Sequence, residues 1–320
     1  MASYPSFDPN VLAIHDGAKL NQVDNALLRD KAQPLLNRAL QGTYPPGSTF
    51  KIVTGSSLLT QSPGTTINTS VDSPTVLTLP QTSHVLHNDQ GEACGDGSGQ
   101  AQLIVAFAQS CDTTFGKIGI QVGANALNDM AEQFGMNDEN LTVPLPVAKS
   151  SYTIPPSQAL TAFSAIGQFS DTVTPLQEAM FAAAVANGGT LMKPDLVQQV
   201  TASDLSTVQG TSPSVLRHAI SSSVADSMKQ MMLAVVQQPE GTAYAFRQDV
   251  TGIEIAGKTG TAETGAVTNL NDAVFTSFAP FANPDIAVGV IIQGGGYGAS
   301  AAAPIAVQVI KAYQQAVGNQ

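Results

Sequence analysis

The sequence predicts an α+β fold in which an antiparallel sheet is flanked by helices and joined to a mostly helical subdomain. Three apolar segments near the C-terminus have the length of strands and are connected by short turns; they are residues 253–258, 273–280 and 286–293. Apolar residues with helical spacing dominate the middle of the chain. A length of 320 residues, 43% of them hydrophobic, is sufficient for a large buried core.

The N-terminal part of the chain is predicted to be irregular. Residues 1–15 look extended, and Pro34 interrupts a mixed segment at residues 25–40. A helix is expected from Ser48, whereas residues 62–100 are rich in Ser, Thr, Pro and Gly, which is typical of a long loop with short strands. Later helices are predicted, in chain order, at residues 100–109, 113–121, 125–134, 157–166, 176–186, 222–237 and 303–316.

These elements predict how the chain is divided. The helical subdomain is expected within about residues 60–220, and the sheet mainly from residues 1–20 and 250–320. The last predicted helix would pack across the sheet. We therefore treat residues 1–320 as one unit that combines a sheet with a helical insertion.

The composition excludes several functional classes. A net charge of −11 argues against binding to nucleic acid and against docking on anionic lipid, both of which need clusters of Lys and Arg. No segment approaches the roughly 18 apolar residues of a membrane span, and no signal peptide is recognisable at the start. Cys94 and Cys111 are too few and too far apart to suggest a zinc site, and no metal or other cofactor is expected.

The most informative pattern is a serine three residues before a lysine. Ser48 and Lys51 follow a stiff turn of Pro45, Pro46 and Gly47, so that a helix can begin at Ser48. Residues i and i+3 of a helix share one face, about 5–6 Å apart at Cβ. The pattern suits a serine nucleophile with a lysine base at a helix N-terminus, which favours negative charge. Taken alone, it equally describes a capping serine and a solvated lysine.

Two further motifs strengthen the catalytic interpretation. Ser110-Cys111-Asp112 lies between the first motif and the segment Lys258-Thr259-Gly260-Thr261. Their order resembles the Ser-x-x-Lys, Ser-x-Asn and Lys-Thr-Gly set of penicillin-binding proteins. The chain is therefore similar to the transpeptidase domain of these proteins, specifically their class B, monofunctional branch. Segments that resemble the family extend over almost the whole chain, at residues 3–10, 37–51, 167–168, 173–177, 186–189, 256–263 and 278–280.

The resemblance implies a penicillin-binding protein or serine β-lactamase-like fold and a set of roles. Ser48 would attack the D-Ala-D-Ala end of a peptidoglycan stem peptide, Lys51 would accept its proton, and Ser110 would pass a proton to the leaving amine. The backbone N–H groups of Ser48 and Thr261 would form the oxyanion hole. β-Lactam antibiotics would acylate the same serine.

The resemblance also assigns substrate-binding roles to the third motif. Lys258 would supply a positive field and orient the terminal carboxylate of the substrate, with the hydroxyls of Thr259 and Thr261 as donors. Gly260 would leave room for the substrate to lie against the strand.

Asp112 departs from the family pattern, which usually has Asn at this position. An ionised Asp only accepts hydrogen bonds, whereas an amide also donates. Close to Lys51, the carboxylate would hold the lysine charged and weaken it as a base. We hypothesise either that Asp112 changes the pH profile by pairing with a lysine or that it reduces β-lactam acylation or turnover.

The two cysteines allow two interpretations, a disulfide or free thiols. In an oxidising compartment Cys94 and Cys111 could pair, which would pin the loop of the second motif to the turn around Cys94. The alternative is a pair of buried free thiols.

The resemblance finally implies a setting for the protein. A class B protein acts on the extracytoplasmic face of the bacterial plasma membrane and carries an N-terminal anchor and a non-catalytic region. The chain reads as an excised domain without them, so cell-division or elongation membrane proteins would bind through the missing part. The alternatives to a D,D-transpeptidase are a hydrolytic β-lactamase or D,D-carboxypeptidase, and a non-enzymatic β-lactam sensor or division scaffold.

Overall fold

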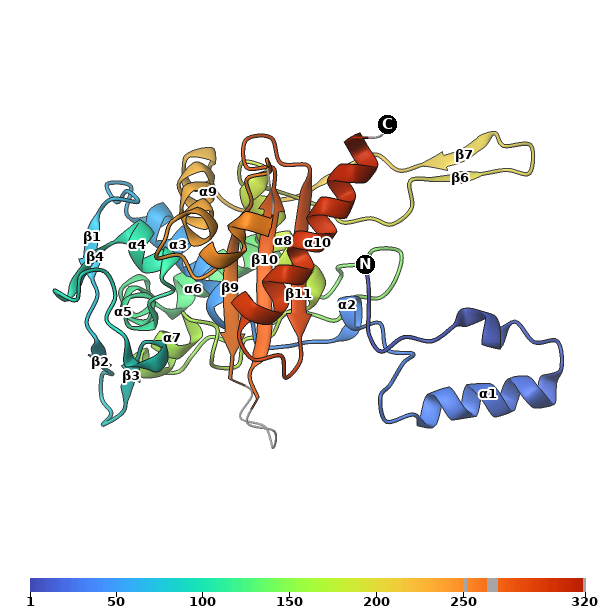
Figure 1. Ribbon diagram of the computed structural model, residues 1–320, viewed down its shortest axis with the longest axis horizontal. Coiled ribbons are helices and arrows are strands. Elements are labelled where there is room, and N and C mark those ends of the chain that lie inside the picture. The colour runs from blue at the N-terminus through green and yellow to red at the C-terminus, as the bar shows by residue number, and fades with distance from the viewer. Residues whose placement is uncertain (250–251, 264–269, 319–320) are drawn as a thin grey trace.

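A sheet forms the centre of the computed structural model, which describes residues 1–249, 252–263 and 270–318. Strands β9 (Ala256–Ala262), β10 (Asp272–Ala279) and β11 (Ile286–Ile292) form it in the antiparallel order β11-β10-β9. Helix α10 (Gly298–Gly318) crosses the front face in Figure 1, and helix α8 (Pro175–Ala186) lies behind it. The C-terminal part of the predicted fold is therefore confirmed.

The sequence explains why these strands form a buried sheet. Every residue of β10 is buried, which fits a central strand covered by helices on both faces. Gly289 lets α8 approach β11, because a Cβ there would lie 2.6 Å from the carbonyl oxygen of Pro175. Strand β9 begins later than predicted and contains the whole segment 258–261, so that the third motif lies at the edge of the sheet.

A mostly helical region packs beside the β9 edge of the sheet (Figure 1). Helix α3 (Lys51–Gln61) runs through it and contacts the helices that carry the second motif and its surroundings. Its other helices are α4 (Leu103–Ala108), α5 (Asp112–Val122), α6 (Ala124–Gln133), α7 (Gln158–Ser164) and α9 (Ser222–Gln237). Short paired strands complete it: β1 (Ser70–Asp72) with β4 (Gln100–Gln102), and β2 (Val76–Thr78) with β3 (Val85–His87). Helix α2 (Arg38–Gln41) lies on the β11 side of the sheet in Figure 1 and contacts α8.

The N-terminal segment differs from its prediction. Residues 1–20 contribute no strand to the described sheet; they contain the short helix η1 (Pro9–Leu12) and the start of α1 (Gly17–Arg29). The side chains of Asp8 and Asp16 accept hydrogen bonds from the first N–H groups of these helices, which favours helix over strand. Neither element buries a residue, and both project from the body (Figure 1).

A second projection lies on the same side of the molecule in Figure 1. It is the hairpin of β6 (Gln199–Thr201) and β7 (Thr207–Gly210). In the chain, the hairpin lies between β5 (Thr190–Met192) and β8 (Val215–His218), which pair with each other. None of the described helices is long and apolar enough to cross a membrane.

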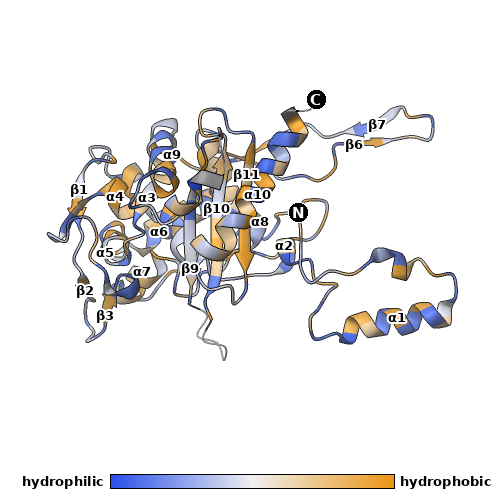
Figure 2. Cartoon of the chain, in the orientation of Figure 1, coloured by the Kyte–Doolittle hydropathy of each residue, from blue (hydrophilic) through white to orange (hydrophobic). Residues whose placement is uncertain are grey.

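Aromatic and methionine side chains fill the core between the helices. Phe107 and Phe115 pack edge to face with ring centroids 5.8 Å apart, and Met231 in α9 is fully buried. Figure 2 shows hydrophobic residues concentrated in the sheet and its covering helices, whereas α1 alternates between hydrophobic and hydrophilic residues. The core therefore spans the sheet and the helical region and holds them together.

A disulfide joins Cys94 to Cys111, as one of the two readings of the sequence expected. The Cα atoms lie 6.1 Å apart, and the cysteines are separated by 17 positions in the chain. Cys111 caps the N-terminus of α5 and is the middle residue of the second motif. The bridge therefore ties this motif to the turn around Cys94.

Replacing both Cys94 and Cys111 by Ser is expected to lower the free energy of unfolding by about 3 kcal/mol, because the loop is no longer closed in the unfolded chain. Urea unfolding of the two proteins measures the difference. A reductant should bring the wild-type midpoint to that of the variant and leave the variant unchanged. Equal midpoints without reductant would contradict the prediction.

Candidate active site

The predicted nucleophile lies on a tight turn that leads into a helix. Residues Gly47–Phe50 form the 3-10 helix η2, which continues directly into α3 at Lys51. Gly47 has a φ of +54° and donates its N–H to the carbonyl of Gly167 at 3.1 Å. A Cβ on Gly47 would lie 2.8 Å from the carbonyl oxygen of Thr261. The turn is therefore held between the loop at residue 167 and the edge strand.

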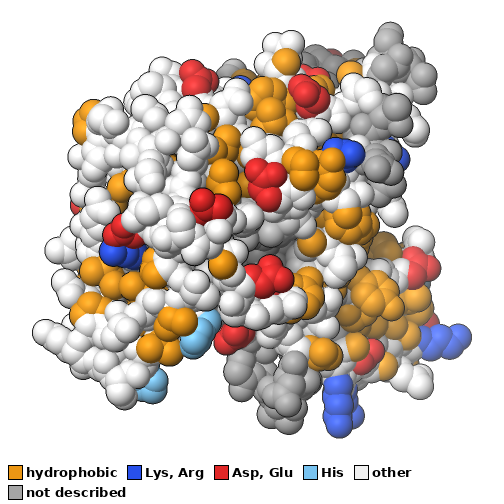
Figure 3. All heavy atoms as spheres, turned by 60° about the vertical axis from the view of Figure 1, so that its left-hand side comes forward, with side chains coloured by type: hydrophobic (Ala, Val, Ile, Leu, Met, Phe, Trp, Pro, Cys, Tyr) orange, Lys and Arg blue, Asp and Glu red, His pale blue; other side chains and the backbone are white. Residues whose placement is uncertain are grey.

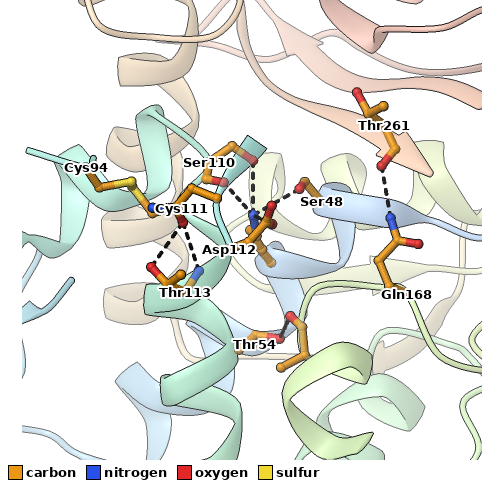
Figure 4. A network of polar contacts seen from close by, with 12 residues as sticks. Ser48, Thr54, Cys94, Ser110, Cys111, Asp112, Thr113, Gln168 and Thr261 are labelled. Carbon is orange, nitrogen blue, oxygen red and sulfur yellow. Dashed lines mark hydrogen bonds and ion pairs between the residues drawn. A yellow bond between two sulfur atoms is a disulfide. The ribbon is translucent and has the colours of Figure 1, made fainter. Parts of the chain in front are cut away.

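Lys51 gathers the first two motifs around one buried nitrogen. Its Nζ lies 2.9 Å from Oγ of Ser48, 2.6 Å from Oδ1 of Asp112 and 2.7 Å from the carbonyl oxygen of Ser110. The side chain is fully buried, whereas the carboxylate of Asp112 is 22% exposed. Figure 4 shows Ser48 on one segment converging with Ser110 and Asp112 on another, at the start of α5. The structure thus brings together the residues that the sequence placed in a common site.

Ser110 lies between the two lysines. Its Oγ is 3.2 Å from Nζ of Lys51 and 2.8 Å from Nζ of Lys258. Ser110 adopts a φ of +62°, a left-handed conformation that a non-glycine residue rarely takes and that is common at functional sites. This backbone conformation turns the hydroxyl towards Lys51 and Lys258 at the start of α5.

Burial lowers the pKa of both lysines. Loss of solvation lowers the pKa of Lys51, and the carboxylate of Asp112 opposes this by charge attraction and hydrogen bonding. Loss of solvation and the neighbouring Lys51 together hold the pKa of Lys258 well below its usual value. The site therefore favours a neutral amine, and Asp112 works against it at Lys51.

The third motif lines the edge of the site. Lys258 is fully buried and donates to the carbonyl of Thr259 at 3.0 Å as well as to Ser110. The hydroxyl of Thr259 lies 2.6 Å from that of Thr242. Thr259 and Thr261 both face the cleft described below, whereas Lys258 acts on it through Ser110.

The structure gives a reason for a glycine at position 260 that differs from the expected room for substrate. A Cβ there would lie 2.8 Å from the carbonyl oxygen of Pro46 and 3.1 Å from Cγ2 of Thr49. The absence of a side chain therefore admits the turn that carries Ser48, and the space is filled by the protein itself.

The sequence did not indicate a role for two residues that make polar contacts at the site, Gln168 and Glu178. Gln168 donates from Nε2 to the carbonyl of Thr261 at 3.1 Å (Figure 4). Its Oε1 accepts from the N–H of Glu263 at 3.3 Å. Glu178, buried in α8, bonds to Thr49 beside the nucleophile. Glu178 is the only acid in the mostly apolar segment 176–186, and this isolation could have indicated a special role. Gln168 carries no such signal, because its partners are distant in the sequence.

A cleft of about 910 Å³ opens in front of these residues. It lies between the helical region and the β9 edge, and its lining includes Ser48, Ser110, Asp112, Thr259 and Thr261. Acidic side chains gather on the hollowed face in Figure 3; those of the lining are Asp89, Glu92, Asp112, Glu240 and Glu263. Within the described ranges, no group of three or more His, Cys, Asp or Glu side chains is placed to hold a metal ion.

Known proteins share both the sequence and this architecture. The family model of the penicillin binding protein transpeptidase domain matches residues 1–311. The peptidoglycan D,D-transpeptidase PbpA of Mycolicibacterium smegmatis is 38% identical over 98% of this chain and 63% of its own length. The MrdA protein of Acinetobacter baumannii, also named a peptidoglycan D,D-transpeptidase, is 31% identical over 94% of this chain and 47% of its own length. The chain thus spans less than two thirds of these relatives.

Solved structures agree with the fold. The ceftriaxone acyl-enzyme of penicillin-binding protein A from M. tuberculosis superposes with a TM-score of 0.89 and 36% identity, covering 97% of this chain and 69% of that one. The transpeptidase domain from Eggerthella lenta has a TM-score of 0.84 and 30% identity, covering 100% of this chain and 75% of that one. With the three motifs assembled in one cleft, the chain belongs to the family of penicillin-binding protein transpeptidase domains.

Proposed function

We propose that this protein is a D,D-transpeptidase that cross-links peptidoglycan stem peptides through an acyl-enzyme on Ser48. The observation that carries the proposal is the 2.9 Å contact between Oγ of Ser48 and a buried, pKa-lowered Lys51 at the wall of a large cleft. The names of the relatives and the β-lactam acyl-enzymes of the M. tuberculosis protein support the same chemistry. No metal or cofactor is needed for it.

Acylation begins with proton transfer within the first motif. A neutral Lys51 accepts the proton of Ser48, whose Oγ attacks the carbonyl carbon of the penultimate D-alanine. The tetrahedral oxyanion is stabilised by the N–H groups of Ser48 and Thr261, which stand on the touching turn and edge strand. Collapse breaks the peptide bond and forms the ester. The proton passes through Ser110, which bonds to both lysines, to the departing D-alanine amine.

Deacylation completes the transfer. The amine of a second stem peptide attacks the ester carbonyl and forms a new peptide bond, the ester bond to Ser48 breaks, and the proton of the amine returns to Oγ of Ser48 through Lys51. The terminal carboxylate of the donor peptide lies at Thr259 and Thr261, which line the cleft. A β-lactam follows the first half of this path and remains on Ser48 as a stable ester.

Gln168 supports the oxyanion hole in this scheme. Its amide bonds to the carbonyl of Thr261 and to the N–H of Glu263 in the way that a neighbouring strand would. The side chain thereby aligns the open edge of β9 next to the turn of Ser48. A carbonyl held in this direction also fixes the direction of the N–H of Thr261.

We also propose the extracytoplasmic side of the bacterial membrane as the place of action. The peptidoglycan substrate and the disulfide between Cys94 and Cys111 support it, because such bonds persist in oxidising compartments. Membrane partners are part of the same proposal. A Helicobacter pylori penicillin-binding protein of the same fold has been solved in complex with MreC, although at 24% identity.

Replacing Ser48 by Ala is expected to abolish covalent labelling by penicillin, because the ester has no other oxygen to form on. Mass spectrometry of the intact protein measures the adduct, and peptide mapping of the wild type should place it on Ser48. Ser62→Ala, at the end of the same helix, should label like the wild type. An unmodified wild type, or an adduct on the Ser48→Ala protein, would contradict the proposed function.

Replacing Asp112 by Asn is expected to shift the rising limb of the acylation pH profile to lower pH. The carboxylate raises the pKa of Lys51, so its removal lets the neutral amine form at lower pH. Below that pKa, acylation should be about three- to tenfold faster. Asp89→Asn is the matched control, because Asp89 raises the pKa of Lys51 less strongly. Identical profiles for the wild type and Asp112→Asn would rule out this role.

Replacing Gln168 by Ala is expected to reduce the acylation rate constant about three- to tenfold, because the edge of β9 loses two hydrogen bonds. Stopped-flow acylation with a fluorescent penicillin measures it. Gln61→Ala removes a comparable glutamine contact at the end of α3 and should have no effect. An unchanged rate in Gln168→Ala would show that the oxyanion hole is positioned without Gln168.

A further inference from the structure

A buried acid lies beside the turn that carries Ser48, and the mechanism above does not use it. Glu178 stands in the first turn of α8, and its side chain is fully buried. Its Oε1 is 2.7 Å from Oγ1 of Thr49, the residue after the nucleophile. The same hydroxyl is 2.8 Å from the carbonyl oxygen of Pro46. Thr49 therefore links α8 to the turn.

The charge of Glu178 can be inferred from the number of protons that the two contacts of the Thr49 hydroxyl require. A threonine hydroxyl has one proton, and an ionised carboxylate and a backbone carbonyl can only accept. Both contacts are hydrogen bonds only if neutral Glu178 donates to Thr49 and Thr49 donates to Pro46. Burial agrees, because it raises the pKa of Glu178 to about 8. Among the described residues, Oε2 has no hydrogen-bond partner, which a neutral acid tolerates better than a carboxylate.

Among the described residues, no charged side chain shifts the pKa of Glu178 to offset a carboxylate at this position. Of the elements in close contact with α8, strands β5 and β11 carry no ionisable side chain. The ionisable residues on the others, none of which is among the causes that shift the pKa of Glu178, are Arg38 on α2, Asp272 on β10, and Asp226 and Lys229 on α9. Burial raises the pKa of Glu178, and the smaller effect of the contact with Thr49 lowers it.

The chain of hydrogen bonds ends where the turn touches β9. The carbonyl oxygen of Pro46 lies against Gly260, and Gly47 lies against Thr261. The direction of the Pro46 carbonyl therefore sets the position of the Ser48 N–H relative to Thr261, the other member of the proposed oxyanion hole. At the other end, the backbone carbonyl of Glu178 accepts from Oγ1 of Thr276 in β10 at 2.5 Å.

We propose that Glu178 is a positioning residue of the acyl-transfer site: as a neutral acid it holds Thr49, which holds the carbonyl of Pro46 and keeps the Ser48 turn aligned with β9. Ionisation of Glu178 draws the proton of Thr49 towards the carboxylate, so that the carbonyl of Pro46 loses its hydrogen bond from the hydroxyl of Thr49. The oxyanion hole then loses alignment. This inference rests on the proposed function.

The decisive comparison is the acylation pH profile of the wild type with that of Glu178→Gln, from about pH 6 to about pH 10. The amide stays neutral and keeps an N–H donor for Thr49, so the variant should acylate within about twofold of the wild type near neutral pH. The ratio of wild-type to variant rates should then fall about three- to tenfold as the pH rises through 8. Lys51 and Lys258 titrate in both proteins, so their effects cancel in the ratio.

Variants of Thr49 separate positioning from binding. Thr49→Val has no proton for Pro46 and should lower the rate constant of acylation while leaving the dissociation constant of penicillin unchanged. Thr49→Ser keeps the hydroxyl and should restore the rate. Asp171→Asn is the matched control, because Asp171 is a second buried acid with a raised pKa and bonds to the hydroxyl of Ser164 rather than to Thr49. It should keep the pH profile of the wild type.

Stability measurements test the neutral state directly. The pKa of Glu178 is raised from 4.5 to about 8 on folding, so protonation stabilises the folded protein at low pH and this contribution is lost as the pH rises. Wild type should lose stability relative to Glu178→Gln between these two values and no further above them. The absence of such a loss would mean that Glu178 is ionised, and would overturn the proposal.

The remaining outcomes are distinct. Parallel acylation profiles of the wild type and Glu178→Gln, or a wild-type rate in Thr49→Val, would overturn the positioning role while the transpeptidase proposal stands. A wild-type protein that penicillin does not acylate would overturn the proposed function itself.

Discussion

The site depends on a single buried amine. Nζ of Lys51 contacts Ser48 on the nucleophile turn, and Ser110 and Asp112 at the start of α5. Because the amine is fully buried, its proton affinity is set by the groups that the fold places around it. An ammonium has three protons and needs acceptors for all of them, whereas a neutral amine offers a lone pair to Ser48. In the proposed mechanism, the balance between these two states decides when Ser48 is activated.

Close approach of backbone segments makes that arrangement possible. Gly47 and Gly260 have no side chains to separate the nucleophile turn from β9, and Gly167 admits the turn from the other side. Gln168 and Glu178 then tie the strand edge and the turn to their neighbours through side-chain hydrogen bonds. The disulfide does the same for the second motif. The chemistry needs separate segments to meet within hydrogen-bonding distance, and most of these constraints serve that requirement.

Ionisable groups of the site are buried at the two lysines and exposed to solvent along the cleft. Burial lowers the pKa of both lysines and the charge of Lys51 lowers that of Lys258 further, while Asp112 raises the pKa of Lys51. Glu92, Glu240 and Glu263 at the cleft are exposed to solvent, where charge costs little. Glu178 is the opposite case, because it is buried without a cation and its pKa is raised. The same residue type therefore has different roles according to its solvation.

The sequence by itself determined the family, the three motifs, most helices and the strands β9 to β11, because local spacing and helix caps carry that information. It could not determine that residues 1–20 lie outside the sheet, since an extended pattern does not specify a partner strand. Nor could it show why position 260 needs a glycine, that Gln168 bonds to the edge of β9, or that Glu178 contacts Thr49. Residues 129 positions apart meet only when α8 packs against the sheet, so tertiary structure alone brought that acid to the nucleophile.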